Sequence, residues 1–224
     1  MTPLKLINAA RTRLLKLRDL WRLAPIASRE SLREFVSARA SLVAQKCAVD
    51  YCRGKTGLFS YALFEEKIFL DALAVCRWES FAATVADLLV ITEGYLRPAA
   101  QAAGGANSVE HVGAALARFY PEILSSYPLP AHRSTQGWSD AEAAFAIRFA
   151  AALAAPPREP VDIADHSARR LFETLPIHVN MRELDEEIVH GAVRFRLIAV
   201  HQELQRRARS TKLVEALAGG KTDP

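Results

Sequence analysis

The sequence predicts an all-α protein, an irregular bundle of about seven to nine helices. Apolar residues recur at helical spacing in one segment after another, and no stretch alternates between apolar and polar residues as a half-buried β-strand would. Residue pairs typical of helix starts, Ser31 with Glu34 and Ser139 with Glu142, precede two of these segments. With 224 residues, 50% of them hydrophobic, the chain is long enough to bury a substantial core.

Proline and glycine mark the ends of the first two predicted helices. An amphipathic segment, Leu4–Leu23, ends before Pro25, because proline disfavours helical backbone in the residue that precedes it. A long second helix runs from Ser31 to a stop at Gly54, since glycine is the usual residue just beyond a helix end.

The segment Phe59–Leu96 is the densest in large apolar residues, and we expect it to be the most buried part of the fold. We expect it to break once near Arg77–Ser80 and to end before Pro98. The alanine- and glycine-rich stretch Ala99–Asn107 then predicts a linker. Burial would raise the pKa of Asp87 in this segment, and hydroxyl groups on the same helix offer it partners, so we expect a structural role for it.

The second half of the chain continues the helical pattern. Its predicted helices cover Ser108–Tyr120, Ser139 to a stop at Pro156, Asp162–Thr174 and Met181–Ala208, with a further turn of helix up to Gly219. A loop punctuated by proline, Pro121–Gly137, separates the first two, and Asn180 resembles the cap of the long last helix. Gly191 lies inside that helix, where glycine costs about 1 kcal/mol relative to alanine, which suggests close contact with a neighbouring helix.

Cysteine content and motif content restrict the chemistry. The three cysteines, Cys47, Cys52 and Cys76, form no CxxC pair and indicate a reducing compartment, where a buried thiol packs as a small apolar group. The tripeptide Gly54-Lys55-Thr56 lacks the first glycine and the strand of a phosphate-binding loop, and the sequence has no GxGxxG or GxSxG motif. No stretch is apolar and long enough to cross a bilayer. We therefore predict no catalytic residue, no metal and no cofactor.

One helical face near the C-terminus carries a continuous polar stripe. Glu187, His190, Arg194 and His201 fall within an arc of about 60° beside an apolar arc. Glu187 and His190 have the E-x-x-H spacing of di-iron bundles, but such a site needs two of these pairs and two further carboxylates. We interpret the stripe as a water-facing surface, with a polar face for a partner or a lined cleft as the alternatives.

The basic charge of the chain is concentrated at its N-terminus. Residues 1–27 hold six Lys or Arg and one Asp, a net charge of +5, whereas the remainder is nearly neutral. On a helical wheel the leucines and Trp21 gather on one side and most of the bases on the other. The residues expected to contact a membrane or a partner are Lys5, Arg11, Leu14, Lys16, Leu17, Arg18, Trp21 and Arg22.

This basic amphipathic arm, residues 1–26, precedes a predicted single all-helical domain, residues 27–224. A basic face opposite an apolar face is typical of helices that lie on anionic membranes. The same pattern suits a first bundle helix whose basic side faces water, a mitochondrial transit peptide if the source is eukaryotic, or an arm that contacts nucleic acid.

Taken together, these patterns favour an interaction or assembly protein without catalysis, whose partners are another protein and an anionic lipid surface. Two alternatives stay open. One is a helical DNA-binding regulator, although the neutral body makes nucleic acid the less favoured partner. The other is an enzyme or ligand binder that uses the face of Glu187, His190 and His201. The expected location is the cytoplasm, at the inner face of a membrane, or the mitochondrial matrix if the source is eukaryotic.

Overall fold

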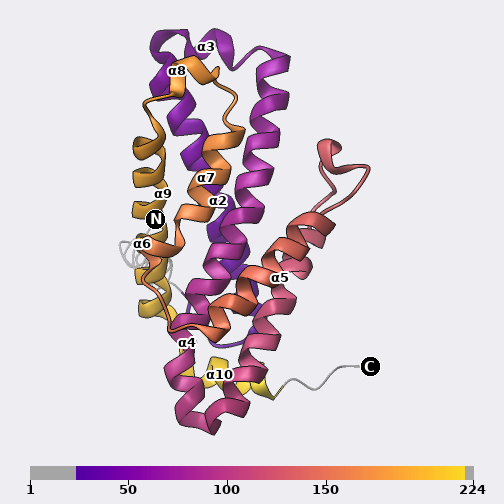
Figure 1. Cartoon of the computed structure of the whole chain (residues 1–224), viewed down its shortest axis with the longest axis vertical. Coiled ribbons are helices and arrows are strands. Elements are labelled where there is room, and N and C mark those ends of the chain that lie inside the picture. The colour runs from indigo at the N-terminus through magenta and orange to yellow at the C-terminus, as the bar shows by residue number, and fades with distance from the viewer. Residues whose placement is uncertain (1–23, 220–224) are drawn as a thin grey trace, which may run out of the picture.

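The computed structural model describes residues 24–219, and these residues form an all-α bundle without a β-strand, as predicted (Figure 1). The longer helices are α2 (Arg29–Thr56), α4 (Lys67–Ser125), α5 (Ser139–Ala154), α7 (Asp165–Thr174), α9 (Glu186–Arg207) and α10 (Ser210–Ala218). Short helical turns connect them: η1 (Gly57–Phe59), α3 (Ser60–Leu63), η2 (Ala131–Arg133), α6 (Pro160–Ile163) and α8 (Val179–Arg182).

Helix α4 reverses its direction at a pair of glycines (Figure 1). Gly104 and Gly105 leave helical geometry, and Gly105 has a φ of 63°, which residues with a side chain rarely adopt. The predicted stop before Pro98 is therefore wrong, and the predicted linker Ala99–Asn107 is confirmed only at these two glycines, since the residues on either side of them are helical. Ala100, just beyond Pro98, is fully buried, and tertiary packing outweighs the local preference of proline.

The first limb of α4, before the glycines, is buried on all sides over its middle. Every residue from 79 to 93 is buried, because α2, α5, α7 and α10 pack against α4. The predicted break near Arg77–Ser80 does not occur in this stretch, which is helical throughout. The expectation of a buried segment is confirmed here but not at its beginning, where Phe59 is 82% exposed.

Several predicted helix starts are displaced. Ser28, rather than Ser31, caps α2: its side chain accepts a hydrogen bond from the Ser31 backbone, and the Ser31 side chain accepts one from the Ser28 backbone. The predicted helix Met181–Ala208 is divided into α8 and α9, and Asp185 between them accepts a hydrogen bond from the Tyr51 hydroxyl of α2 at 2.8 Å.

The first described residues are hydrogen-bonded to the junction between α9 and α10. Ile26 is buried in the core, its N–H donates to the Arg207 carbonyl at 3.0 Å, and its carbonyl accepts from the Arg209 N–H at 2.9 Å. The Arg207 Nε also donates to the Ala24 carbonyl at 3.0 Å. The last residues of the predicted arm are thus built into the body, while residues 1–23 lie outside the described part of the chain.

We predict that Gly105→Ala lowers the free energy of unfolding by about 1 to 3 kcal/mol, because the turn would hold alanine in a backbone conformation that its Cβ disfavours. Gly54→Ala is the matched control. Gly54 lies in α2 and a Cβ there meets no described atom within 4 Å, so stability should rise by about 0.4 to 1 kcal/mol. Urea denaturation measures both changes, and equal effects would contradict the strain assigned to the turn.

Candidate functional site

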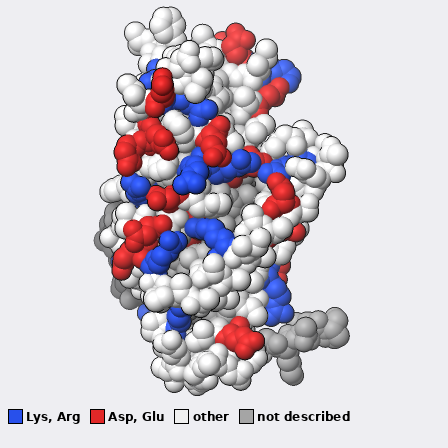
Figure 2. Space-filling model, in the orientation of Figure 1, with Lys and Arg blue, Asp and Glu red and all other residues white. Residues whose placement is uncertain are grey.

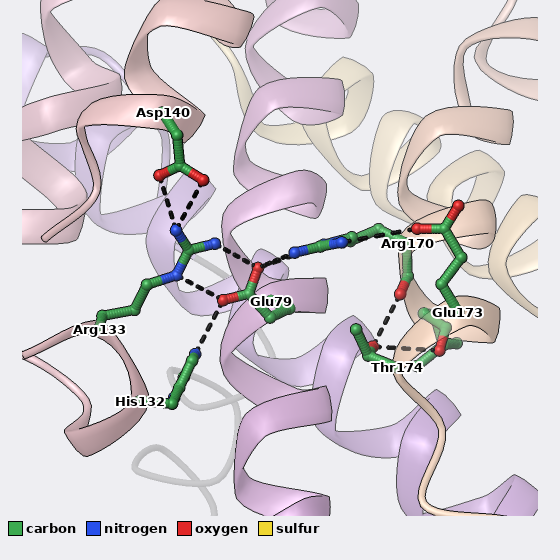
Figure 3. Close-up of polar contacts among 8 residues, drawn as sticks. Glu79, His132, Arg133, Asp140, Arg170, Glu173 and Thr174 are labelled. Atoms are coloured by element: carbon green, nitrogen blue, oxygen red, sulfur yellow. Dashed lines mark hydrogen bonds and ion pairs between the residues drawn. The ribbon is translucent and has the colours of Figure 1, made fainter. Parts of the chain in front are cut away.

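The strongest concentration of buried charge surrounds Glu79 in the middle of α4 (Figure 3). Its carboxylate accepts two hydrogen bonds from Arg133, each of 2.6 Å, and further bonds from Arg170 of α7. The Nε2 atom of His132 lies 2.8 Å from the same carboxylate. Arg133 also binds both oxygens of Asp140, at 2.6 and 2.8 Å. The cluster therefore joins α4, the loop before α5, α5 itself and α7.

Glu79 is held as a permanent carboxylate. Burial alone would raise its pKa, but hydrogen bonds from Arg133, Arg170 and His132 outweigh burial and lower the pKa to about 2. Near neutral pH the group therefore does not exchange protons as a general acid or base must. Its chemical role here is to bind the surrounding cations.

A second buried carboxylate, Asp87, lies two turns further along α4. One oxygen accepts a 3.0 Å hydrogen bond from the Ser167 backbone, and the other lies 2.6 Å from Arg148 Nη2 in an ion pair without hydrogen-bond geometry. Burial raises the pKa of Asp87 to about 6, against the opposing effect of Arg148 and Ser167. This matches the predicted direction, but the partners come from α5 and α7 rather than from α4 itself.

A third buried pair, Glu93 with Arg97, attaches α4 to the end of α5. Arg97 donates to both oxygens of Glu93, at 2.7 and 2.6 Å, and to the backbone carbonyls of Ala152 and Ala155. The last carbonyls of a helix have no partner inside it, so Arg97 supplies the missing donors at the C-terminus of α5. Three buried carboxylates of α4 thus fix the positions of α5 and α7.

The cavity beside the Glu79 cluster is small, about 280 Å³, and lies at the lower limit of ordinary ligand sites. Its polar lining includes Tyr120 and His166, and burial lowers the pKa of His166 to about 4, which leaves it neutral. Charged residues form a band across the middle of this face (Figure 2). Within residues 24–219, no three His, Cys, Asp or Glu side chains are grouped so as to hold a metal ion.

The structure separates His201 from the other three polar residues predicted on α9. Arg194 lies between Asp165 of α7, at 2.9 Å, and Glu187, at 3.3 Å, and His190 is within 4.0 Å of Asp165. His201 lies apart against a tyrosine ring of α4, where burial lowers its pKa. The interpretation of a water-facing stripe is wrong at His190, which is buried because α6 and α7 pack against α9.

The remaining predictions concern the N-terminal arm, the cysteines and membrane-spanning segments. The arm residues from Lys5 to Arg22 lie outside the described part of the chain, so their contacts stay predictions. Cys47, Cys52 and Cys76 are free and buried, as expected for packing thiols, and burial raises the pKa of Cys47 to about 11. Among the described residues, no helix combines the length and the apolar character needed to cross a membrane.

Glu79, Arg133 and Arg170 were not predicted from the sequence. A charged residue within an apolar helical stretch is the one available signal, and the signal that identified Asp87 applies equally to Glu79. The arginine partners are 54 and 91 residues away from Glu79 along the chain, so no local sequence pattern predicts that they contact it.

Comparison with protein-family models, with curated proteins and with solved structures found no match for this chain. Function therefore has to be inferred from the arrangement of its own residues.

We predict that Glu79→Gln lowers the free energy of unfolding at pH 7 by about 3 to 5 kcal/mol, since it removes the buried charge that pairs with Arg133 and Arg170 and leaves buried Arg133 only Asp140, which is 55% exposed, as a charge partner. Because the folded pKa of Glu79 is about 2, its stabilisation is fully present above pH 4.5 and is lost as the pH falls towards 2. The difference in free energy of unfolding between the variant and the wild type, measured by urea denaturation, should therefore become smaller as the pH falls over that interval. Glu173→Gln, at a side chain 52% exposed, is the control and should change stability by less than about 0.5 kcal/mol.

Asp87→Asn should show the opposite pH dependence. Because the folded pKa of about 6 lies above the ordinary value of 3.8, ionisation favours the unfolded state, and the wild type loses stability as the pH rises between these values. Two pKa units correspond to roughly 3 kcal/mol. Asparagine still accepts the hydrogen bond from Ser167 and does not ionise. The stability of the variant relative to that of the wild type should therefore increase as the pH rises over this interval. Thermal midpoints measured stepwise from acid to neutral pH test this, and a constant difference would contradict it.

Proposed function

We propose that this chain is a non-catalytic interaction protein that binds a partner protein through one apolar end of its helical bundle. The observation that carries this proposal is a set of large apolar side chains with exposed fractions from 52% to 95%. This apolar end consists of Leu58, Phe59, Tyr61, Ile68, Val179, Met181 and Leu184. The residues come from two segments, one around η1 and α3 and one around α8, which lie at the same end of the molecule (Figure 1).

Contacts between these two segments hold the apolar end in place. The Nζ atom of Lys55, near the end of α2, lies 2.6 Å from the carboxylate of Asp185, which also accepts the hydrogen bond from Tyr51. Asp185 directly follows Leu184, and Lys55 is followed three residues later by Leu58, so the ion pair connects the two halves of the surface. Large exposed apolar side chains gathered at one end of a molecule are typical of protein interfaces.

The charge around the apolar end distinguishes between partners. Residues 53–71 and 178–188 together hold four Lys or Arg and seven Asp or Glu, a net charge of −3. An anionic membrane surface would be repelled by this excess of carboxylates. A cationic amphipathic helix, in contrast, offers apolar contacts together with complementary charge. We therefore expect the partner protein to present such a helix.

The other functional classes have weaker support. Catalysis on the α9 face would need Glu187, His190 and His201 together, and His201 lies apart from the other two. Glu79, Asp87 and Glu93, the buried carboxylates of α4, are each paired with arginine, which gives them a structural role. Docking on anionic lipid depends on the N-terminal arm and stays a prediction.

We predict that the triple variant Leu58→Ser, Phe59→Ser, Ile68→Ser binds a synthetic lysine/leucine amphipathic helical peptide at least about tenfold more weakly than the wild type. These side chains are more than four-fifths exposed, so stability should change by less than about 0.5 kcal/mol. Fluorescence anisotropy of the labelled peptide measures affinity, and added salt should weaken binding by the wild type.

Two controls make this experiment decisive. Ile147→Ser removes an apolar side chain of α5 that is 75% exposed but lies outside the apolar end, and it should bind the peptide as the wild type does. A glutamate/leucine peptide of the same length should bind poorly to all variants. Unchanged peptide affinity in the triple variant, or binding of the apolar end to phosphatidylglycerol vesicles, would contradict the proposal.

A further inference from the structure

Two hollows lie along the seam between α2 and α9, and Arg196 lines both of them. The upper hollow, of about 390 Å³, is nearer the apolar end, and the lower one, of about 460 Å³, is nearer the α9–α10 junction. Together they form the α2/α9 groove, whose apolar lining includes Leu42, Ile188, Ala192, Phe195, Ala199 and Val200.

The groove leaves large apolar surface uncovered by any described residue. Leu42 is 50% exposed, Ile188 64% and Phe195 72%. Gly191 lies between the last two on the same face of α9, and a Cβ there would meet no described atom within 4 Å. The close helix contact that glycine suggests at this position is therefore not supplied by residues 24–219.

The charged residues of the groove are largely satisfied by one another. Arg39 of α2 binds Glu203 of α9 at 2.6 Å, and Arg196 of α9 binds Asp50 of α2 at 2.8 Å. These pairs cross the seam and hold the two helices together. What the groove offers a ligand is mainly apolar contact.

The chain enters the fold directly beside the lower end of this groove. Arg207, which donates to the Ala24 carbonyl, also pairs with Glu203 in the groove. The bridge between Ile26 and Ala208 is parallel, and Ala24 lies beside Arg207, so the first described residues meet the end of α9 from the side of the groove.

The length of the arm matches the length of the groove. A helix of residues 4–21 is about 27 Å long, and the stretch of α9 from Ile188 to Arg206 is about 28.5 Å long, at 1.5 Å per residue. On that helix Leu14, Leu17 and Trp21 share one side and most of the bases lie on the other. An apolar face of this kind covers the groove while its basic face stays in water.

We propose that residues 4–21 form a helix whose apolar face, with Leu14, Leu17 and Trp21, packs into the α2/α9 groove of the same chain. The arm is then a helix of the bundle. The apolar face that would enter a membrane is occupied by the protein itself, so lipid binding requires the arm to leave the groove.

Trp21 reports directly on this contact in the full-length protein. The emission difference between wild type and Trp21→Phe isolates Trp21 from the other two tryptophans. Without lipid, we expect Trp21 to emit at short wavelength and to be several-fold protected from acrylamide quenching. Leu42→Ser and Phe195→Ser should shift its emission to longer wavelength and remove the protection, whereas Ile147→Ser, on α5, should change neither.

Vesicles containing phosphatidylglycerol separate the docked arm from a membrane arm. If Trp21 is accessible to acrylamide in the free protein and becomes protected only with vesicles, the arm is a membrane helix and the proposal is overturned. If Ile147→Ser exposes Trp21 as much as Phe195→Ser does, the assignment to the groove is wrong. The triple variant of the apolar end should leave Trp21 unchanged, so this proposal and the proposed function fail independently.

Discussion

The burial of carboxylates along one helix is the constraint on which this fold depends. The middle of α4 is surrounded by other helices, yet it contains Glu79, Asp87 and Glu93. A buried charge that loses its partner costs several kcal/mol, so each carboxylate requires a cation or an N–H group close by. The neighbouring helices supply these groups, or bind the arginine that does, and the positions of α5 and α7 follow from that requirement.

This arrangement reverses the usual distribution of charge and apolar surface in two places. Ion pairs occupy the centre of the bundle, whereas large apolar side chains are exposed at the apolar end and along the α2/α9 groove. Internal networks whose members are all paired specify one arrangement of helices, which keeps the outer surfaces in fixed geometry. A body with uncovered apolar surfaces of this kind is suited to binding other helices.

The sequence predicted those features that depend on near neighbours. Helical periodicity identified the fold class, which depends on residues three or four positions apart. Local rules failed where distant packing outweighed them, as at Pro98, where the buried surroundings keep the helix intact. The candidate site was found only in part, because the partners of Asp87 and Glu79 come from helices that the chain brings together only on folding.

The attachment of Ile26 to the α9–α10 junction determines when the chain completes its fold during synthesis. The segments from α2 to α9 must all leave the ribosome before Arg207 and Arg209 become available to Ile26, and α10, which packs on α4, emerges later still. Closing so long a loop is slow compared with forming local helices. Helix α2 therefore lacks part of its packing until α9 and α10 have formed, and its apolar face stays exposed for that time.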